Sequence, residues 1–214
     1  MGDSLGDRIK SYEKVFSPSL LKRMPVMIRV DGRAFHTLAK HLDKPFDQRL
    51  MNAMVSAAMD VAMNMQGFKA AYIQSDEATF CITDYDRIES QGWFDYDLSK
   101  IVSLSASLMA VRFAEYFPIS WGINGSLIFD SRAFNVPIHD VVNAFLWRAK
   151  DWERNRIQMY ARAFFSHKQL MNKDREDMHE LLYGLGKNPA TDLSEREKNG
   201  TFLIAAGTKD HDVK

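Results

Sequence analysis

The sequence predicts an α+β fold, in which a β-α-β-β-α-β sheet domain precedes a C-terminal helical extension. Short apolar runs alternate with two long segments of helical period in the first two thirds of the chain. The last third differs, because its long helical pattern is also charged. The order of elements is that of the split β-α-β folds called ferredoxin-like.

The first half of this order is a strand followed by a helix. Residues 26–30 (VMIRV) are β-branched and apolar, and Asp-Gly stops the run. Residues 47–66 carry apolar side chains at helical spacing, with Asp47 as a suitable N-cap. Gly67 is a plausible C-terminal stop for this helix.

The second half is a hairpin, a helix and a strand. Residues 70–74 (AAYIQ) and 78–83 (ATFCIT) are apolar runs, and only residues 75–77 (SDE) lie between them, which is typical of a hairpin. Helical periodicity returns over 98–113, and 126–134 (SLIFDSRAF) is a further strand.

The chain after this strand is predicted to be mainly helical. A long helix covers about 140–165, and a second covers 174–183. Near the end, KNGTFLIAAG places a turn dipeptide before an apolar run, so an arm of a last hairpin is possible. We therefore expect a sheet domain over 1–138 and a helical extension over 139–214 that packs on it.

Composition sets broad limits on function. Hydrophobic residues make up 46 % of the 214 residues, which is typical of a globular protein. The 28 Lys+Arg balance the 28 Asp+Glu, so the chain lacks the net positive charge that would favour nucleic-acid binding. The one cysteine, Cys81, excludes an internal disulfide framework and a cysteine metal cluster. No apolar run approaches the ~18 residues of a membrane span. We expect a cytoplasmic protein without a membrane partner.

Two acidic motifs are predicted to meet at the ends of strands. Asp31 ends the first strand, and Asp76 and Glu77 lie in the hairpin turn. In a split β-α-β sheet the first and third strands are central neighbours, so these carboxylates come close together and need a compensating cation. Mg²⁺ is the usual cation for oxygen ligands beside phosphates. Gly32 lets the backbone approach a ligand. Each motif taken alone is also ordinary turn material.

Basic and polar residues near these motifs favour a phosphate-bearing substrate. Arg29, Arg33, His36 and Lys44 surround the first motif, and arginine or lysine there would pair with phosphates. Lys100 and a row of serines that includes Ser103 lie near a helix N-terminus, where anions are favoured. A solvated helix face explains the serines equally well. The sequence has no GxxxxGK[ST] or GxGxxG loop.

Four ordered motifs resemble those of the tRNA-His guanylyltransferase superfamily, over about residues 5–165. They are RVDGRAFH (29–36), QSDEATF (74–80), KIVSLSAS (100–107) and FDSRAFNVP (129–137). Members add nucleotides to the 5′ end of RNA in the 3′–5′ direction, and their catalytic domain resembles the palm of polymerases. The resemblance therefore implies a palm-like α+β catalytic domain and a nucleotidyltransferase activity.

The resemblance also implies roles for individual residues. Asp31 and Asp76 match the metal-binding carboxylates, Gly32 matches a backbone-carbonyl ligand, and Glu77 matches the neighbouring acidic residue of the catalytic motif. The positions that match nucleotide-binding segments or phosphate-handling positions are Arg29, Asp31, Gly32, Arg33, Ala34, Phe35, His36, Lys44, Ser75, Asp76, Lys100 and Ser103.

One departure from the eukaryotic enzymes is informative. Where they carry a His-Ile-Asn-Asn motif, this chain has Glu153, with Arg154 and Arg156 flanking Asn155. This version resembles the guanylyltransferase-like proteins of bacteria, archaea and their viruses, which repair 5′-truncated tRNAs under a template. It favours templated 3′–5′ polymerisation over untemplated addition of one G to tRNA-His.

The implied reaction uses two Mg²⁺ ions, ATP or GTP to activate a 5′-monophosphate, and an incoming nucleoside triphosphate whose 3′-hydroxyl attacks the activated end. The expected partners are tRNA, nucleoside triphosphates and other subunits of a homotetramer. A subunit interface is suggested by apolar residues among the charges of the helical region: Trp147, Trp152, Met159, Phe164 and Phe165. The predicted RNA contacts lie on the charged helical region and are Arg148, Arg154, Arg156 and Lys168. A solvated helix face is an equal alternative explanation for these charges.

Two other classes of protein remain alternatives. One is a palm-type nucleotidyl cyclase, and the other is a non-enzymatic RNA-binding protein.

Overall fold

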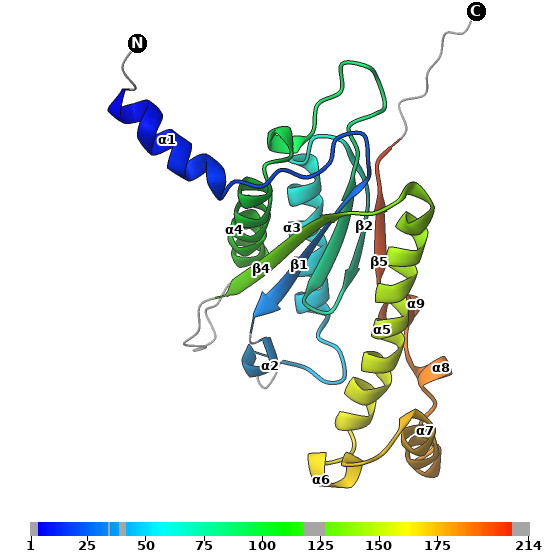
Figure 1. Cartoon of the computed structure of the whole chain (residues 1–214). Coiled ribbons are helices and arrows are strands. Elements are labelled where there is room, and N and C mark those ends of the chain that lie inside the picture. The colour runs from blue at the N-terminus through cyan, green and yellow to red at the C-terminus, as the bar shows by residue number, and fades with distance from the viewer. Residues whose placement is uncertain (1–3, 34, 39–41, 118–126, 207–214) are drawn as a thin grey trace, which may run out of the picture.

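A computed structural model describes residues 4–33, 35–38, 42–117 and 127–206 of the chain. Its centre is an antiparallel sheet with the strand order β4-β1-β3-β2-β5 (Figure 1). The strands are β1 (Val26–Arg33), β2 (Phe68–Gln74), β3 (Glu77–Ile82), β4 (Ile128–Asn135) and β5 (Thr201–Ile204).

The predicted order of elements is confirmed. Helix α3 (Gln48–Met63) follows β1, and helix α4 (Leu98–Tyr116) follows the β2–β3 hairpin. Four strands in the order β4-β1-β3-β2 make the split β-α-β arrangement, with β1 and β3 as central neighbours. The predicted C-terminal hairpin is wrong, because β5 pairs with β2, which is distant in the sequence.

Helices α3 and α4 cover one face of the sheet, and the main core lies between them and the strands (Figure 1). Alternate residues of β1 (Val26, Ile28 and Val30) point into this core, as the period of a strand requires. Asp47 caps α3, because its side chain accepts hydrogen bonds from the backbone N–H groups of Arg49 and Leu50.

Helix α5 (Val141–Arg162) packs on the opposite face. Phe145 joins Met27, Tyr72 and Cys81 of the sheet in a small cluster. Further along α5, Trp152 belongs to a second core. The elements after α5 are α6 (His167–Leu170), α7 (Arg175–Gly184), α8 (Pro189–Asp192) and α9 (Glu195–Asn199). Trp152 is thus a core residue and not the interface residue that the sequence suggested.

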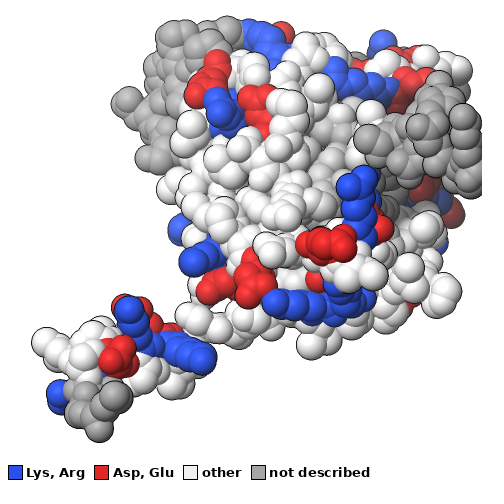
Figure 2. Space-filling model, turned by 90° about the horizontal axis from the view of Figure 1, so that it is seen from above, with Lys and Arg blue, Asp and Glu red and all other residues white. Residues whose placement is uncertain are grey.

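Helix α1 (Leu5–Val15) has no buried residue and projects away from the sheet (Figures 1 and 2). Short helical segments complete the described chain: α2 (Phe35–Leu38), η2 (Trp93–Tyr96) and η3 (Ile138–Asp140). Within the described ranges, none of the helices has the length and apolar character that crossing a membrane requires.

Candidate active site

Three carboxylates form a row across three neighbouring strands. Asp31 of β1 is paired with Glu77 of β3 on one side and with Asp130 of β4 on the other. Directly paired residues of antiparallel strands project from the same face, here the face on which α5 packs. The predicted meeting of the first motif with the hairpin motif therefore follows from the strand register.

Strand β1 does not stop at Asp31 as predicted. Its pairing with β3 ends there, because β3 begins at Glu77, but its pairing with β4 continues through Gly32 and Arg33. Glu77 is likewise a strand residue, and the turn between β2 and β3 consists of Ser75 and Asp76 alone. Ser75 holds the left-handed backbone conformation, with a φ of 48°.

Gly32 ties the first strand to the hairpin turn. Its N–H donates a hydrogen bond of 2.9 Å to the backbone carbonyl of Asp76. A Cβ added at Gly32 would lie 2.5 Å from the ring of Phe35 and 3.0 Å from the Cβ of Asp76, so only glycine fits here without a shift. The backbones that carry Asp31 and Asp76 are therefore held against each other.

The charges of this site repel one another. Burial, followed by the nearby charges of Asp76, Glu77 and Asp130, raises the pKa of Asp31 to about 6, against the opposing effect of Arg29. Burial also raises the pKa of Asp76. Both carboxyl groups thus ionise less readily than usual, which is the behaviour of acidic groups placed to share a cation.

The donor set fits Mg²⁺. No group of three or more His, Cys, Asp or Glu side chains among the described residues is placed to hold a metal ion. Mg²⁺ ordinarily takes one or two protein carboxylates and completes its shell with water and substrate phosphates. Asp31, Asp76 and the approachable backbone of Gly32 supply such a partial set, and the repulsion between the carboxylates would be relieved by the cation.

Glu77 is neutralised from within the protein. Its two carboxylate oxygens accept hydrogen bonds of 2.6 Å from Nε and Nη2 of Arg148, and Nη2 also reaches Asp151 at 2.9 Å. Glu77 is 7 % exposed and Arg148 is 8 % exposed. This buried pair corrects the prediction that Arg148 contacts RNA. No local pattern indicates this pair, because the partners are 71 positions apart.

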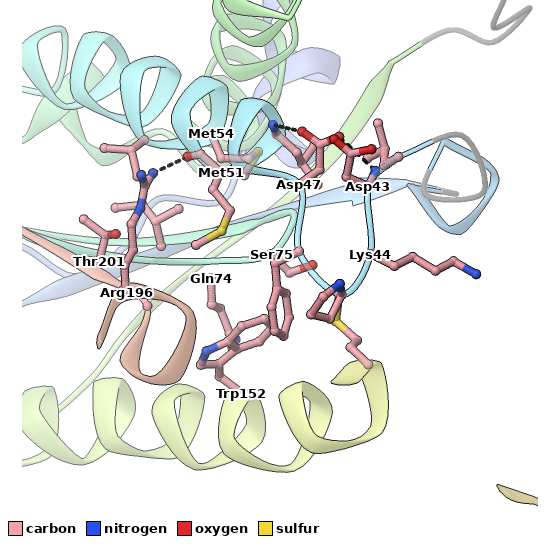
Figure 3. A pocket seen from close by; sticks show the side chains of 18 of the residues that line it. Asp43, Lys44, Asp47, Met51, Met54, Gln74, Ser75, Trp152, Arg196 and Thr201 are labelled. Carbon is pink, nitrogen blue, oxygen red and sulfur yellow. Dashed lines mark hydrogen bonds between the residues drawn. The ribbon is translucent and has the colours of Figure 1, made fainter. Parts of the chain in front are cut away.

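Two cavities meet beside the carboxylates. A polar cleft of about 340 Å³ is lined by Asp31, Asp76 and Glu77 together with residues of α5. A pocket of about 200 Å³ lies between α3, α5 and the C-terminal segment, with Met51, Met54 and Trp152 among its walls (Figure 3). Both are lined by Gln74, Ser75, Trp152, Met159 and Arg162. The two cavities therefore adjoin each other along these side chains, and we refer to them below as the joined cavities.

The predicted nucleotide-binding residues that follow Gly32 in the sequence do not all lie at the site. Arg33 is exposed at the end of β1, whereas the ring of Phe35 is buried against Phe113 and Phe129. Phe35 thus supports Gly32 from the core, and its ring is not available to a ligand. His36 lies in α2, and Ala34 is outside the described residues.

Of three other predicted residues, Ser75 and Lys44 line the joined cavities, and Arg29 lies on the carboxylate face of the sheet without lining either cavity. Ser75 lines both of them, and Lys44 lines the pocket with its amino group directed away from it (Figure 3). The guanidinium of Arg29 lies 5.5 Å from the ring centre of Trp147. Its Nε is buried and has no hydrogen-bond partner within the described part of the chain. Arg29 therefore keeps one donor unused on the carboxylate face.

The structure does not bring Lys100 and Ser103 to the carboxylates within one chain. They lie on exposed positions of the first turns of α4, which packs on the other face of the sheet. Phe113, near the C-terminal end of α4, contacts Phe35 beside Gly32. Lys100 lies thirteen residues earlier, roughly 20 Å away along the helix. Ser103 instead donates a hydrogen bond of 2.7 Å to the carbonyl of Ser99.

The other predicted RNA contacts are divided. Arg154 is exposed and pairs with Asp151 at 2.5 Å, and Lys168 is exposed on α6. Arg156 donates a hydrogen bond of 2.6 Å to the carbonyl of Lys198, so it joins α5 to α9. Arg154 and Lys168 are thus free to approach a ligand, and Arg156 has a structural role.

Comparisons with known proteins find similar chains among tRNA(His) guanylyltransferases and Thg1-like proteins. A bacterial tRNA(His) guanylyltransferase (Thg1)-like protein solved in complex with ATP superposes with a TM-score of 0.88 at 40 % identity, over 94 % of this chain and 86 % of that one. A bacterial Thg1-like protein in complex with GTP gives a TM-score of 0.78 at 37 % identity, over 94 % and 85 %. A probable tRNA(His) guanylyltransferase of Dictyostelium discoideum is 28 % identical over 209 residues, 94 % of this chain and 72 % of the relative.

The family model described as "Thg1: tRNAHis guanylyltransferase" matches residues 6–137, which include β1, the β2–β3 hairpin and β4. The match contains the carboxylate row and the Gly32–Asp76 contact. The chain belongs to the tRNA(His) guanylyltransferase (Thg1) family of nucleotidyltransferases.

Proposed function

We propose that this protein adds nucleotides to the 5′ end of truncated tRNA in the 3′–5′ direction, under the direction of a template. The observation that carries the proposal is the Gly32–Asp76 backbone contact, which holds Asp31 and Asp76 at the mouth of the joined cavities. A nucleoside triphosphate fits this arrangement, because it needs charge compensation at one end and an apolar space at the other.

The nucleotide lies across the two cavities. Its triphosphate faces Asp31 and Asp76, and its base enters the pocket walled by Met54 and Trp152. The indole N–H of Trp152 donates to the carbonyl of Glu197 at 3.1 Å, which fixes this wall. Bound by Asp31, Asp76 and Gly32, two Mg²⁺ ions would neutralise phosphate oxygens and lower the pKa of the attacking hydroxyl.

The reaction has two transfers. A 5′-phosphate oxygen of the RNA attacks the α-phosphorus of ATP or GTP, and pyrophosphate leaves. The 3′-hydroxyl of the incoming nucleotide then loses its proton, attacks the activated 5′ phosphorus and displaces AMP or GMP. The protein positions these groups and offsets charge. A 5′-triphosphate end enters at the second transfer.

The RNA follows α5 away from the carboxylates. The polar cleft adjoins a cavity of about 250 Å³ through Gln158 and Arg162, and Lys173 lines that cavity as well. From Asp151 to Arg162 the helix advances roughly 16 Å. Arg162 is exposed, and it has no hydrogen bond or ion pair among the described residues. This chain of clefts supports a path for the end of an RNA strand.

Templated addition is favoured over untemplated addition of a single G to tRNA-His. Glu153, rather than histidine, stands at this position of α5, and Arg175 of α7 pairs with it at 3.1 Å. The 40 % identity to the bacterial Thg1-like protein supports the same choice. Incubation of 5′-truncated tRNAs with labelled nucleotides, at matched and mismatched template positions, tests it. Equal incorporation at both kinds of position would favour untemplated addition.

A subunit interface is proposed for α1. Its apolar residues recur on one side of the helix and are 48 % to 69 % exposed in a single chain (Leu5, Ile9 and Tyr12). An isolated helix of 11 residues is marginal in water, so α1 needs a partner, and we propose that a homotetramer provides it.

The carboxylate assignment is tested by Asp76→Ala. Incorporation of labelled nucleotide into RNA should be lost, while the circular dichroism spectrum stays unchanged. Normal turnover by the folded variant would contradict the metal assignment. The alternative function, a nucleotidyl cyclase, is tested by incubating the wild type with GTP or ATP alone. A cyclase would form a cyclic nucleotide without RNA.

A further inference from the structure

Gln74 occupies the junction of the two cavities. It is the last residue of β2, lies opposite Glu77, and lines both the polar cleft and the apolar pocket (Figure 3). The residue is 5 % exposed. The carbonyl oxygen Oε1 is buried and has no hydrogen-bond partner within the described part of the chain. Buried acceptors are normally paired, so this one requires a donor.

The orientation of the Gln74 amide follows from its neighbour. Nε2 donates to Oε1 of Glu77 at 3.4 Å. Glu77 is bound by both nitrogens of the Arg148 fork, so it is a carboxylate that only accepts hydrogen bonds. A flipped amide would place two acceptors together. The amino group therefore faces Glu77, and the unpaired oxygen is the group left for a ligand.

The position of Gln74 indicates which part of a bound nucleotide lies next to it. Along the row Asp31, Glu77, Gln74, two steps between strands separate Gln74 from Asp31 by roughly 10 Å. The apolar pocket begins beyond it, with Ile73 and Trp152 in its lining. The sugar lies between the phosphates and the base of any nucleotide, and its hydroxyl groups are donors.

We infer that Gln74 is a ribose-recognition residue, whose Oε1 accepts a hydrogen bond from a sugar hydroxyl of the bound ribonucleoside triphosphate. The inference rests on the proposed placement of the nucleotide across the two cavities. The Glu77–Arg148 pair holds the amide in place, so the network orders the acceptor before the ligand arrives.

The test measures binding and not turnover, so it stands even if the protein extends no RNA. The dissociation constants of ATP, 2′-deoxy-ATP and 3′-deoxy-ATP are measured by calorimetry with Mg²⁺ for the wild type and for Gln74→Met. In the wild type, one deoxy analogue should bind about five- to tenfold more weakly than ATP. Gln74→Met should bind ATP and that analogue equally. The analogue that weakens identifies the hydroxyl.

Two controls separate this role from a structural one. Gln66→Met, an exposed glutamine after α3, should keep the wild-type discrimination. Gln74→Asn keeps the amide, but its side chain is one methylene shorter, so the carbonyl oxygen no longer reaches the sugar. This variant should therefore lose the discrimination between ATP and the deoxy analogue. The inference is overturned if the wild type binds all three nucleotides within twofold, or if a folded Gln74→Met still discriminates. If Gln74→Met does not fold, Gln74→Asn provides the same comparison, and a wild type without discrimination overturns the inference in either case.

Discussion

Arg148 and Glu77 form a bidentate ion pair with two hydrogen bonds of 2.6 Å, which joins the middle of α5 to the first residue of β3. Thr79 and Gln74 also donate to Glu77, at 3.3 and 3.4 Å. The pair thereby fastens the C-terminal helical part of the chain to the β2–β3 hairpin, and it neutralises a carboxylate beside Asp31 and Asp76.

The first prediction concerns Arg148→Ala. The change leaves Glu77 buried without its partner, so we expect the free energy of unfolding to fall by about 3–5 kcal/mol. Arg154→Ala is the matched control, because Arg154 pairs with Asp151 in the solvent and should lose less than about 1 kcal/mol. Urea unfolding measures both. Equal losses in the two variants would contradict a special role for the buried pair.

The second prediction concerns Gly32→Ala. Its methyl group would meet the Phe35 ring and the Cβ of Asp76, so the contact between β1 and the hairpin turn must open. Overpacking of this kind costs about 1–3 kcal/mol, and nucleotide incorporation should fall as well. Gly184→Ala at the end of α7 is the control, since no atom lies within 4 Å of the added methyl. Wild-type activity and stability in Gly32→Ala would refute the close approach.

The strand order and the carboxylate pair were predictable because local patterns encode them. The hydrophobic periods of β1, the hairpin and the helices specify the split β-α-β order, which makes β1 and β3 neighbours. Their register then places Asp31 beside Glu77. The predicted end of β1 was too early, because a strand can continue beyond its hydrophobic run when it is paired on one side. Gly32 and Arg33 continue β1 in this way by pairing with β4.

Long-range pairing was the part that the sequence could not provide. Arg148 looked like an exposed base of a charged helix, and its true partner is distant in the chain. Ser103 looked like a phosphate ligand, but its hydroxyl satisfies a carbonyl of its own helix. The unpaired oxygen of Gln74 depends on which groups surround it, and no spacing in the sequence reports that.

The third prediction concerns Asp31→Asn without metal, in EDTA. Because the pKa of Asp31 is about 6 in the fold and 3.8 ordinarily, the folded chain holds more protons here than the unfolded chain between these values. Ionisation therefore lowers the free energy of unfolding as pH rises from about 4 to 7. Asp31→Asn should be no more stable than wild type at about pH 4, and more stable by on the order of 1 kcal/mol above pH 7, since half-exposure weakens the effect.

Thermal or urea unfolding across this pH range measures the difference between Asp31→Asn and the wild type. Added Mg²⁺ should remove or reverse the advantage of the variant, because the cation stabilises the ionised carboxylates of the wild type. An advantage of Asp31→Asn that is independent of pH would show that the crowding of carboxylates is not its cause.

The fourth prediction concerns the RNA path along α5. Replacing Arg162 and Lys173 by alanine should weaken tRNA binding, and should reduce the slope of log affinity against log salt by about 0.7–0.9 for each lost phosphate contact. Arg112→Ala is the control, because this arginine pairs with Glu115 on α4, on the opposite side of the sheet. Fluorescence titrations at several salt concentrations measure the slopes. An unchanged slope in the double variant would remove this path.

The last prediction concerns α1 and the assembly. Ile9 and Tyr12 are 48 % and 61 % exposed in the single chain and lie on the same side of a helix with no buried residue. A charge at Ile9 would be driven out of an apolar interface but tolerated on a free surface, so Ile9→Glu should shift the sedimentation coefficient toward smaller species. Lys10→Glu, which changes a neighbouring polar position, should leave it unchanged. If Ile9→Glu sediments like the wild type, α1 is not the contact that holds the assembly together.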